Sequence, residues 1–186
     1  MIRIRKARPA DAIAIAAVHV ATWRTTYPGI LPENYLSRLS VSRQAAYYDG
    51  AIRSGTGVLV ATASGEDVPS GSGSRIIGFS TAGRARSSGR NLAEGEIETL
   101  YVLDDYRDLG VGRGLLHAAG EHLRDLGCRS AYLWVLRDNP SRWFYQRLGG
   151  RPAMEEDILF AGQAVIQTAF VWDPIDRLLA SSPLKS

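Results

Sequence analysis

Hydrophobic and polar positions in the N-terminal part of the chain follow two periodicities. Residues 2–5 alternate apolar and charged side chains, which predicts a short β-strand. Residues 12–22 are rich in Ala, Ile and Val and follow a proline and an aspartate, an order typical of a helix start. Pro28-Gly29 predicts a turn, and residues 32–52 predict a second helical region with an irregular middle.

The middle of the chain predicts three β-strands separated by polar loops. The strands are expected at residues 57–63, 75–82 and 96–102, where apolar and β-branched side chains dominate. Residues 64–74 are rich in Gly, Ser and Pro and predict a mobile surface loop, and residues 84–94 predict a second polar loop. The first two strands are therefore expected to pair as a hairpin with a long connection.

A Gly-rich turn after the third of these strands leads into a predicted helix over residues 111–126. Apolar residues recur along it at helical spacing, as at Leu116 and Leu123. A strand is expected next, at residues 129–136. Residues 96–136 thus predict a βαβ unit, which we expect to be right-handed.

The C-terminal part of the chain predicts a short helix and a closing hairpin. The helix is expected to start at Asn139-Pro140 and to end near Leu148, because Asn is a good cap and Pro suits a first helical turn. Strands at 154–160 and 164–172 would form the hairpin, and its exposed edge would suit pairing with a second copy of the chain.

Together these elements predict an α/β fold of one domain. Seven strands would form a mixed central sheet flanked by helices, with the βαβ unit inside it. A length of 186 residues suits one domain, which we place at 1–173. Residues 174–186 are expected to form a C-terminal tail that is helical at most.

Composition and charge narrow the class of partner. The formal net charge is +3 and no run of five Lys or Arg occurs, so no nucleic-acid partner is expected. No stretch of eighteen apolar residues and no signal segment are present, so we expect a cytoplasmic protein without a membrane partner. Cys128 is the only cysteine and is expected in the core, and no metal-binding spacing of His or Cys occurs.

The strongest chemical signal is the segment 102–114, which follows a predicted strand and opens a helix. Free amides and a partial positive charge at a helix start favour a phosphate group, and glycines let it approach the backbone. A dinucleotide fingerprint and a Walker loop both fit the spacing worse. A Gly-rich turn that only starts a helix remains the alternative. The residues concerned are Gly110, Gly112 and Gly114, with Arg107 and Arg113 as added cations.

Two motifs resemble those of the GNAT superfamily of N-acetyltransferases. Residues 107–112 match the family's Arg/Gln-x-x-Gly-x-Gly/Ala motif, and Asn139 followed by residues 144–149 matches its Asn…Phe-Tyr-x-x-Leu-Gly motif. Gly150 replaces the usual aromatic residue, a departure that affects packing rather than chemistry. The resemblance spans residues 2 to about 172, and residues 22–32 resemble one branch whose acceptors are mostly unassigned.

By this resemblance the acetyl donor is acetyl-CoA. Its pantetheine arm would pair with the strand near residues 100–102, and its pyrophosphate would lie on the amides of residues 109–114. The resemblance implies a donor site made of Leu100, Tyr101, Val102, Arg107, Asp108, Leu109, Gly110, Val111, Gly112, Arg113, Gly114, Asn139 and Tyr145.

Amine acetylation also needs a base and an acid. An alkylammonium must lose a proton before it attacks, and a carboxylate can take it. Glu96 and Glu98 are two apart in a predicted strand and are expected on one face; the resemblance favours Glu96, with two solvent-facing edge residues as the alternative. Tyr145 is, by resemblance, the acid that protonates the leaving thiolate, with a packed aromatic as the alternative.

The acceptor is expected to be a primary amine of a small molecule or peptide, whose identity stays open. By resemblance, Trp23 and Tyr27 belong to the region that shapes its pocket, although core aromatics are an equal alternative. Trp134, Trp143 and Trp172 are expected in the core. A non-catalytic module that only binds acyl-CoA remains the second functional hypothesis.

Overall fold

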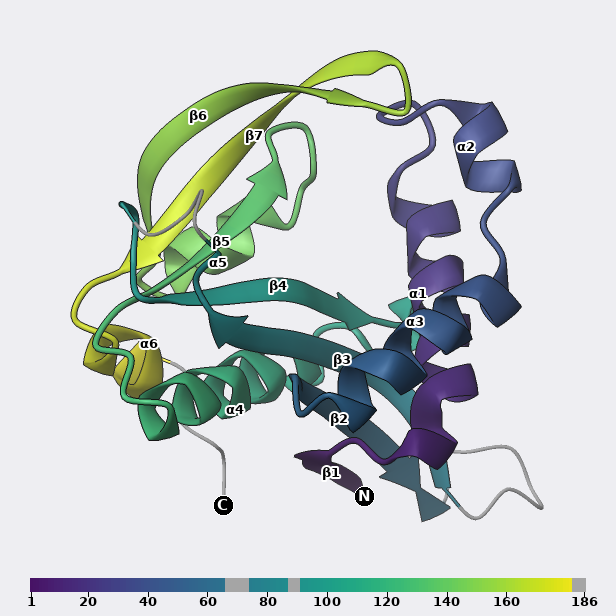
Figure 1. Ribbon diagram of the computed structural model, residues 1–186, viewed down its shortest axis with the longest axis horizontal. Coiled ribbons are helices and arrows are strands. Elements are labelled where there is room, and N and C mark those ends of the chain that lie inside the picture. Colours follow the sequence, from purple (N-terminus) through teal and green to yellow (C-terminus); the bar gives the residue numbers. More distant parts are fainter. Residues whose placement is uncertain (66–73, 87–90, 182–186) are drawn as a thin grey trace.

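A seven-stranded mixed sheet runs through the molecule in the computed structural model, which describes residues 1–65, 74–86 and 91–181 (Figure 1). The strand order is β1-β2-β3-β4-β5-β7-β6, and β4–β5 is the one parallel pair of the described sheet. The α/β fold expected from the sequence is confirmed. The strands are β1 (Ile2–Lys6), β2 (Gly57–Ser64), β3 (Ser74–Arg84), β4 (Gly95–Val102), β5 (Ala131–Leu136), β6 (Arg151–Phe160) and β7 (Gln163–Trp172).

Helices cover both faces of the N-terminal part of the sheet (Figure 1). On one face, Ile15 and Tyr48 pack with alternate residues of β2 and with two residues of β3 on either side of a register shift. On the other, Leu115 and Leu123 pack with the intervening residues, and Leu116 and Leu123 of the predicted apolar stripe are both fully buried. The helices are α1 (Ala12–Thr26), α2 (Glu33–Ser37), α3 (Val41–Arg53), α4 (Val111–Asp125), α5 (Arg142–Arg147) and α6 (Asp176–Ser181), with 3₁₀ turns η1 (Pro9–Asp11) and η4 (Asp104–Tyr106).

Strands β4 and β5 pair only at their beginnings. The pairs are Gly95 with Ala131 and Glu96 with Tyr132, after which the two strands diverge (Figure 1). Beyond Glu96, the edge of β4 that faces β5 has no strand partner among the described residues. The sheet therefore opens at its centre, beside the start of α4.

A β-bulge in β4 interrupts the alternation of side chains at Glu98. Thr81 of β3 lies opposite Thr99, whereas the next residue along β3 lies opposite Ile97, so Glu98 is the extra residue. Ile97 and Leu100 consequently pack in the same core cluster, although they are three apart. The expectation that Glu96 and Glu98 share a face assumed a regular strand. Because of the bulge, a spacing of two residues does not by itself place them on the same face.

Several boundaries differ from the expected ones. The helical region at 32–52 is two helices, α5 starts two residues after Pro140, and β6 starts at Arg151. The tail is helical at α6, whose Leu178 is fully buried against α4. The expected loops at 64–74 and 84–94 and the last residues of the tail lie partly outside the described residues. None of the described helices combines the length and apolar character needed to cross a membrane.

Candidate active site

A cleft of about 1520 Å³ opens where β4 and β5 diverge. This exceeds the roughly 300–1,000 Å³ of a site for one small ligand, so two molecules have room to lie side by side. We call its two parts the amide half, lined by residues 99–102, residues 106–114 and α5, and the aromatic half. The aromatic half is lined by Trp23, Tyr27, Leu31, Glu98, Trp134, Ile158, Phe160 and Gln167.

The amide half is built on the start of α4. Gly110 has φ +79° and caps the helix, and the amide of Gly114 is the first in α4 to donate along the helix, to the Gly110 carbonyl at 3.0 Å. The amides of residues 111–113 therefore have no acceptor within the helix and face the same direction. Together with the helix dipole they suit an anionic group such as a diphosphate.

Gly112 brings this helix start close to neighbouring elements. A Cβ atom added at Gly112 would lie 3.3 Å from Cζ of Phe144 and 3.8 Å from Cδ2 of Leu100. The first is tighter than an ordinary van der Waals contact, so a side chain here would crowd α5 and β4. The glycine pattern in the sequence thus corresponds to a real narrow passage at residue 112.

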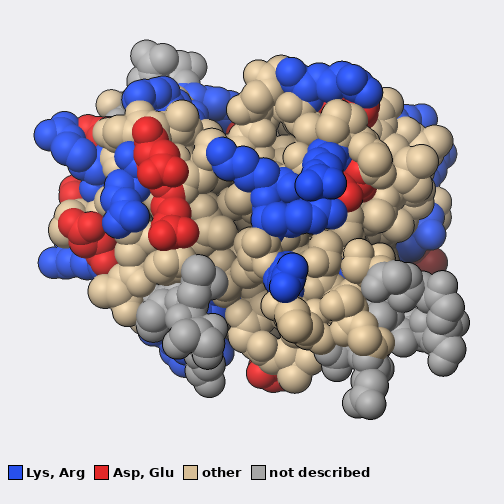
Figure 2. All heavy atoms as spheres, turned by 90° about the horizontal axis from the view of Figure 1, so that it is seen from below, with Lys and Arg blue, Asp and Glu red and all other residues tan. Residues whose placement is uncertain are grey.

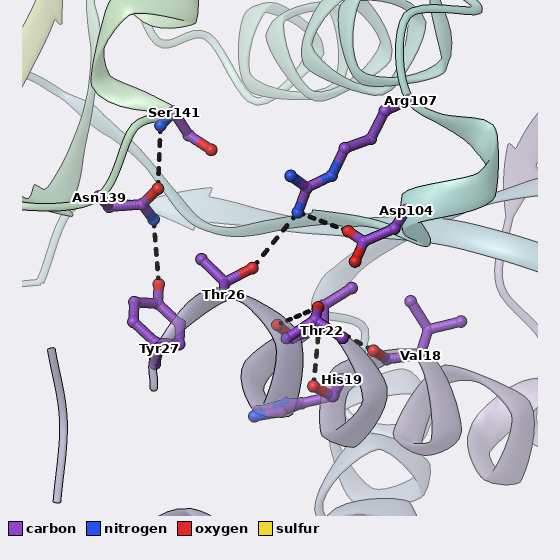
Figure 3. Close-up of polar contacts among 10 residues, drawn as sticks. Val18, His19, Thr22, Thr26, Tyr27, Asp104, Arg107, Asn139 and Ser141 are labelled. Atoms are coloured by element: carbon purple, nitrogen blue, oxygen red, sulfur yellow. Dashed lines mark hydrogen bonds and ion pairs between the residues drawn. The ribbon is translucent and has the colours of Figure 1, made fainter. Parts of the chain in front are cut away.

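Two polar contacts tie the amide half to the last turn of α1 (Figure 3). Arg107 donates to the Thr26 hydroxyl at 3.3 Å and forms an ion pair with Asp104 at 2.7 Å. The amide nitrogen of Asn139 donates to the Tyr27 hydroxyl at 3.3 Å, while its side-chain oxygen accepts from the Ser141 backbone at 2.9 Å. Residues that the sequence suggested separately, for the donor and for the acceptor, therefore meet at α1.

Arginines give the amide half its positive charge. Arg107 and Arg113 line it, as does Arg147 from the last turn of α5, which sequence reasoning missed. The signal for Arg147 was weak, because it is one of many scattered arginines and only the fold brings it to the cleft. On the face seen from below, Lys and Arg side chains gather near the middle, and Asp and Glu lie mainly to the left (Figure 2).

The two predicted carboxylates lie in different surroundings. Glu96 is only 3% exposed, and its Oε1 and Oε2 accept from Arg86 Nη2 at 2.6 Å and Nε at 3.1 Å. Glu98 lines the cleft and is exposed to solvent on one side. The buried part of its side chain raises the pKa of Glu98; the charge of Arg86 opposes this rise and that of Glu96 adds to it.

Tyr145 lies at the junction of the two halves, on α5. It is 7% exposed, lines the cleft and packs in the main core cluster. Burial first, and then the proximity of Tyr27, raises the pKa of its phenol. The ring of Phe144 stands edge-on to it, at 5.3 Å between centroids. The structure therefore places Tyr145 both in the core and on the cleft wall.

The aromatic half gathers side chains from elements far apart in sequence. Trp23 lies 4.9 Å from Tyr27 and 5.9 Å from Phe160 between ring centroids. Trp134, expected in the core, packs partly buried against a core cluster and also lines the cleft. Trp143, also expected in the core, is 55% exposed, whereas Trp172 is fully buried as expected. Phe160 and Ile158 were missed, because nothing in the sequence of a hairpin strand shows that it overhangs a cleft.

Comparison with known proteins agrees with this geometry. Residues 20–150 match the Acetyltransferase (GNAT) family. The chain is 33% identical to the uncharacterized N-acetyltransferase YuaI of Bacillus subtilis over 178 residues, 96% of each chain. It is 27% identical over 150 residues, 78% of each chain, to a probable N-acetyltransferase of Mycobacterium tuberculosis.

Solved structures share the fold. The PaiA N-acetyltransferase of Thermoplasma acidophilum, in complex with coenzyme A, superposes with a TM-score of 0.62 at 21% identity and covers 90% of this chain and 98% of its own. The yncA protein of Salmonella typhimurium, with its cofactor acetyl-CoA, gives 0.66 at 21% identity, covering 93% and 94%. The resemblance seen in the two sequence motifs is confirmed: the chain belongs to the acetyltransferase (GNAT) family and is an acyltransferase that uses acetyl-CoA.

Proposed function

We propose that the protein transfers the acetyl group of acetyl-CoA directly to a primary amine of a small molecule or peptide. One observation carries this proposal: the divergence of β4 and β5 brings an anion-binding helix start, a cleft carboxylate and a buried phenol into a single cleft. A module that only binds acyl-CoA would need the anion-binding helix start, but neither the carboxylate nor the phenol.

The amide half fits the donor. Amides of residues 111–113 would hold the diphosphate, and Arg107 and Arg113 would add charge-assisted contacts. The open edge of β4 at residues 100–102 would hydrogen-bond the extended amide-bearing arm in the manner of an added strand. Further contacts are proposed for Asp108, Leu109 and Asn139, which also line the cleft.

We assign the base to Glu98 in preference to Glu96. The donor supplies a thioester carbonyl, which only a neutral amine can attack. Glu98 lines the cleft, and its raised pKa brings it closer to the working pH, as suits a general base. Glu96 is the second candidate, since both its oxygens already accept hydrogen bonds from Arg86.

Two further groups complete the chemistry. A backbone N–H of β4 near Val102 would stabilise the negative charge that develops on the carbonyl oxygen. The Tyr145 hydroxyl would give its proton to the departing sulfur, and the raised pKa keeps the phenol protonated until then. Both groups line the same cleft as Glu98.

The proposal is tested by calorimetry with acetyl-CoA and by amine-dependent thiol release, with the acetylated amine identified by mass spectrometry. We expect binding and release together. Binding without release for any amine would favour the binding-only module instead. No affinity for CoA or its acetyl ester would refute the proposal.

A further inference from the structure

The β6–β7 hairpin closes one end of the cleft. Its tip reaches the segment between α1 and α2 (Figure 1), where the Gln163 side-chain nitrogen donates to the Ile30 carbonyl at 3.0 Å. Behind this bond, the Phe160 ring meets Tyr35 edge-on at 5.0 Å and Trp23 at 5.9 Å between centroids. The aromatic half is therefore a pocket bridged at its far end rather than a groove that runs across the surface.

The walls of this pocket are mostly apolar, and charged groups on them are few. Its walls are aromatic and aliphatic, with Gln167 as a neutral polar group. Among the described residues that line the cleft, the acids are Glu98 and Asp108, and Asp108 belongs to the amide half. The pocket thus holds one negative group beside apolar walls. Glu98 is exposed to solvent on one side; the buried part of its side chain raises its pKa, and the nearby Arg86 opposes that rise.

We propose that the acceptor is a compact primary amine with a single positive charge and an apolar, preferably aromatic, body. This inference rests on the proposed function and narrows it. The ammonium group would pair with Glu98 before it loses its proton, and the body would pack among Trp23, Tyr27 and Phe160. Aromatic walls suit both parts, since ring faces attract cations and ring edges pack against other rings.

Other amines meet specific obstacles in this pocket. A polyamine would bury a second ammonium group against apolar walls, where an unpaired charge is costly. An amino acid would bring its carboxylate within a few bonds of Glu98, and the two like charges would repel each other. A peptide would have to leave through the end that Gln163 and Phe160 close.

A matched panel of acceptors tests the inference: 2-phenylethylamine, phenylalanine, spermidine and a short peptide with an N-terminal alanine. We expect kcat/KM for 2-phenylethylamine to exceed each of the others by about 100-fold, because mismatched charged groups discriminate more strongly than a lost methylene does. If spermidine, phenylalanine or the peptide is the best substrate, the inference is wrong while the acetyltransferase stands. If acetyl-CoA binds and no amine of the panel reacts, the inference fails, while the proposed function fails only if no other amine supports thiol release either.

Substitutions at two neighbouring positions of β6 test whether Phe160 contacts the amine. Phe160→Ala should raise KM for 2-phenylethylamine about tenfold, a loss of the size that deleting one well-packed ring causes, with KM for acetyl-CoA unchanged. Leu159→Ala is the control, because Leu159 is 77% exposed and does not line the cleft. If Phe160→Ala does not fold, Phe160→Leu keeps the apolar volume, and a several-fold rise in the amine KM alone is expected. Equal KM values for all variants, or a rise for both substrates, would overturn the assignment.

Discussion

The two halves of the cleft are built from different materials. The amide half uses backbone groups from one short stretch, the turn at residues 106–114, beside an open strand edge. The aromatic half uses side chains from α1, β4, β5, β6 and β7, which lie far apart in the chain. Backbone recognition of phosphate depends on a local conformation that glycines encode, whereas a side-chain pocket depends on the whole fold. In the proposed function, a local motif would therefore hold the donor and a composite surface would hold the acceptor.

The last turn of α1 joins the two halves. Thr26 accepts from Arg107 of the amide half, and Tyr27 accepts from Asn139, next to the aromatic half (Figure 3). Through these contacts the position of Trp23 and Tyr27 depends on the loop that is expected to bind the donor. The two halves would bind their ligands in different ways, but the contacts with α1 link the position of one half to that of the other.

The largest expected effect tests whether the amide half works through its backbone. Gly112→Glu would fill the narrow passage beside Phe144 and put an anion at the helix start. Excluding a diphosphate removes two or more charge-assisted hydrogen bonds of about 1.5–3 kcal/mol each, so we expect acetyl-CoA to bind about 1,000-fold more weakly. Calorimetry measures this directly.

Gly50→Glu provides the matched control for this change. Gly50 lies on α3, and a Cβ atom added there would meet nothing within 4 Å. The control should bind acetyl-CoA like the unmodified protein. Unchanged affinity in Gly112→Glu would contradict the placement of the phosphates at this helix start.

The next effect concerns Tyr145, which we propose acts in the reaction rather than in binding by either half. Tyr145→Phe keeps the ring in the core and removes the hydroxyl, so we expect kcat to fall about 100-fold, the scale of a general acid, with an unchanged dissociation constant for acetyl-CoA. Rapid kinetics and calorimetry separate the two quantities. Tyr47→Phe, at a ring 60% exposed on α3, is the control. Full turnover in Tyr145→Phe would remove this residue as the acid.

The contrast between a local motif and a surface built by tertiary packing also explains which features could be predicted from the sequence. The seven strands and the Gly-rich helix start follow local rules, and the structure contains them. The bulge at Glu98 could not be predicted, because a single extra residue in a strand leaves the apolar pattern almost unchanged. Phe160 and Arg147 were missed for another reason: only tertiary packing brings the hairpin and the end of α5 to the cleft. Trp134 packs against a core cluster as expected, but its second role on the cleft wall depends on the divergence of β5 from β4, which the sequence does not show.

A smaller effect distinguishes the two carboxylates by their pH dependence. A base acts as its carboxylate, so activity falls as the pH drops through its pKa, and the raised pKa of Glu98 places this loss nearer neutrality. Glu98→Gln cannot ionise, so this acidic limb should vanish and the optimum should move to higher pH. We expect kcat/KM near neutral pH to fall about 30-fold, since solvent replaces a positioned base poorly.

The pH profile of Glu96→Gln completes this comparison. Glu96 holds Arg86 through two hydrogen bonds, so its replacement should mainly lower stability, by about 1–2 kcal/mol given that Arg86 is largely exposed. The acidic limb should remain. If instead Glu96→Gln abolishes the limb and Glu98→Gln keeps it, the base is Glu96, as the family resemblance first suggested.

The smallest expected effect sharpens the difference between the halves most directly. If backbone amides carry the phosphate contact, Arg107→Gln should weaken acetyl-CoA binding only about fivefold, because one half-exposed cation contributes about 1 kcal/mol. Arg107 is 50% exposed and already paired with Asp104 at 2.7 Å, which reduces its contribution further. The dissociation constant at low and high salt checks this, with Arg53→Gln as the control, since Arg53 is also paired with an aspartate on the exposed side of α3. A loss as large as that of Gly112→Glu would mean that side chains, and not the backbone, bind the donor, and the two halves would then follow the same principle.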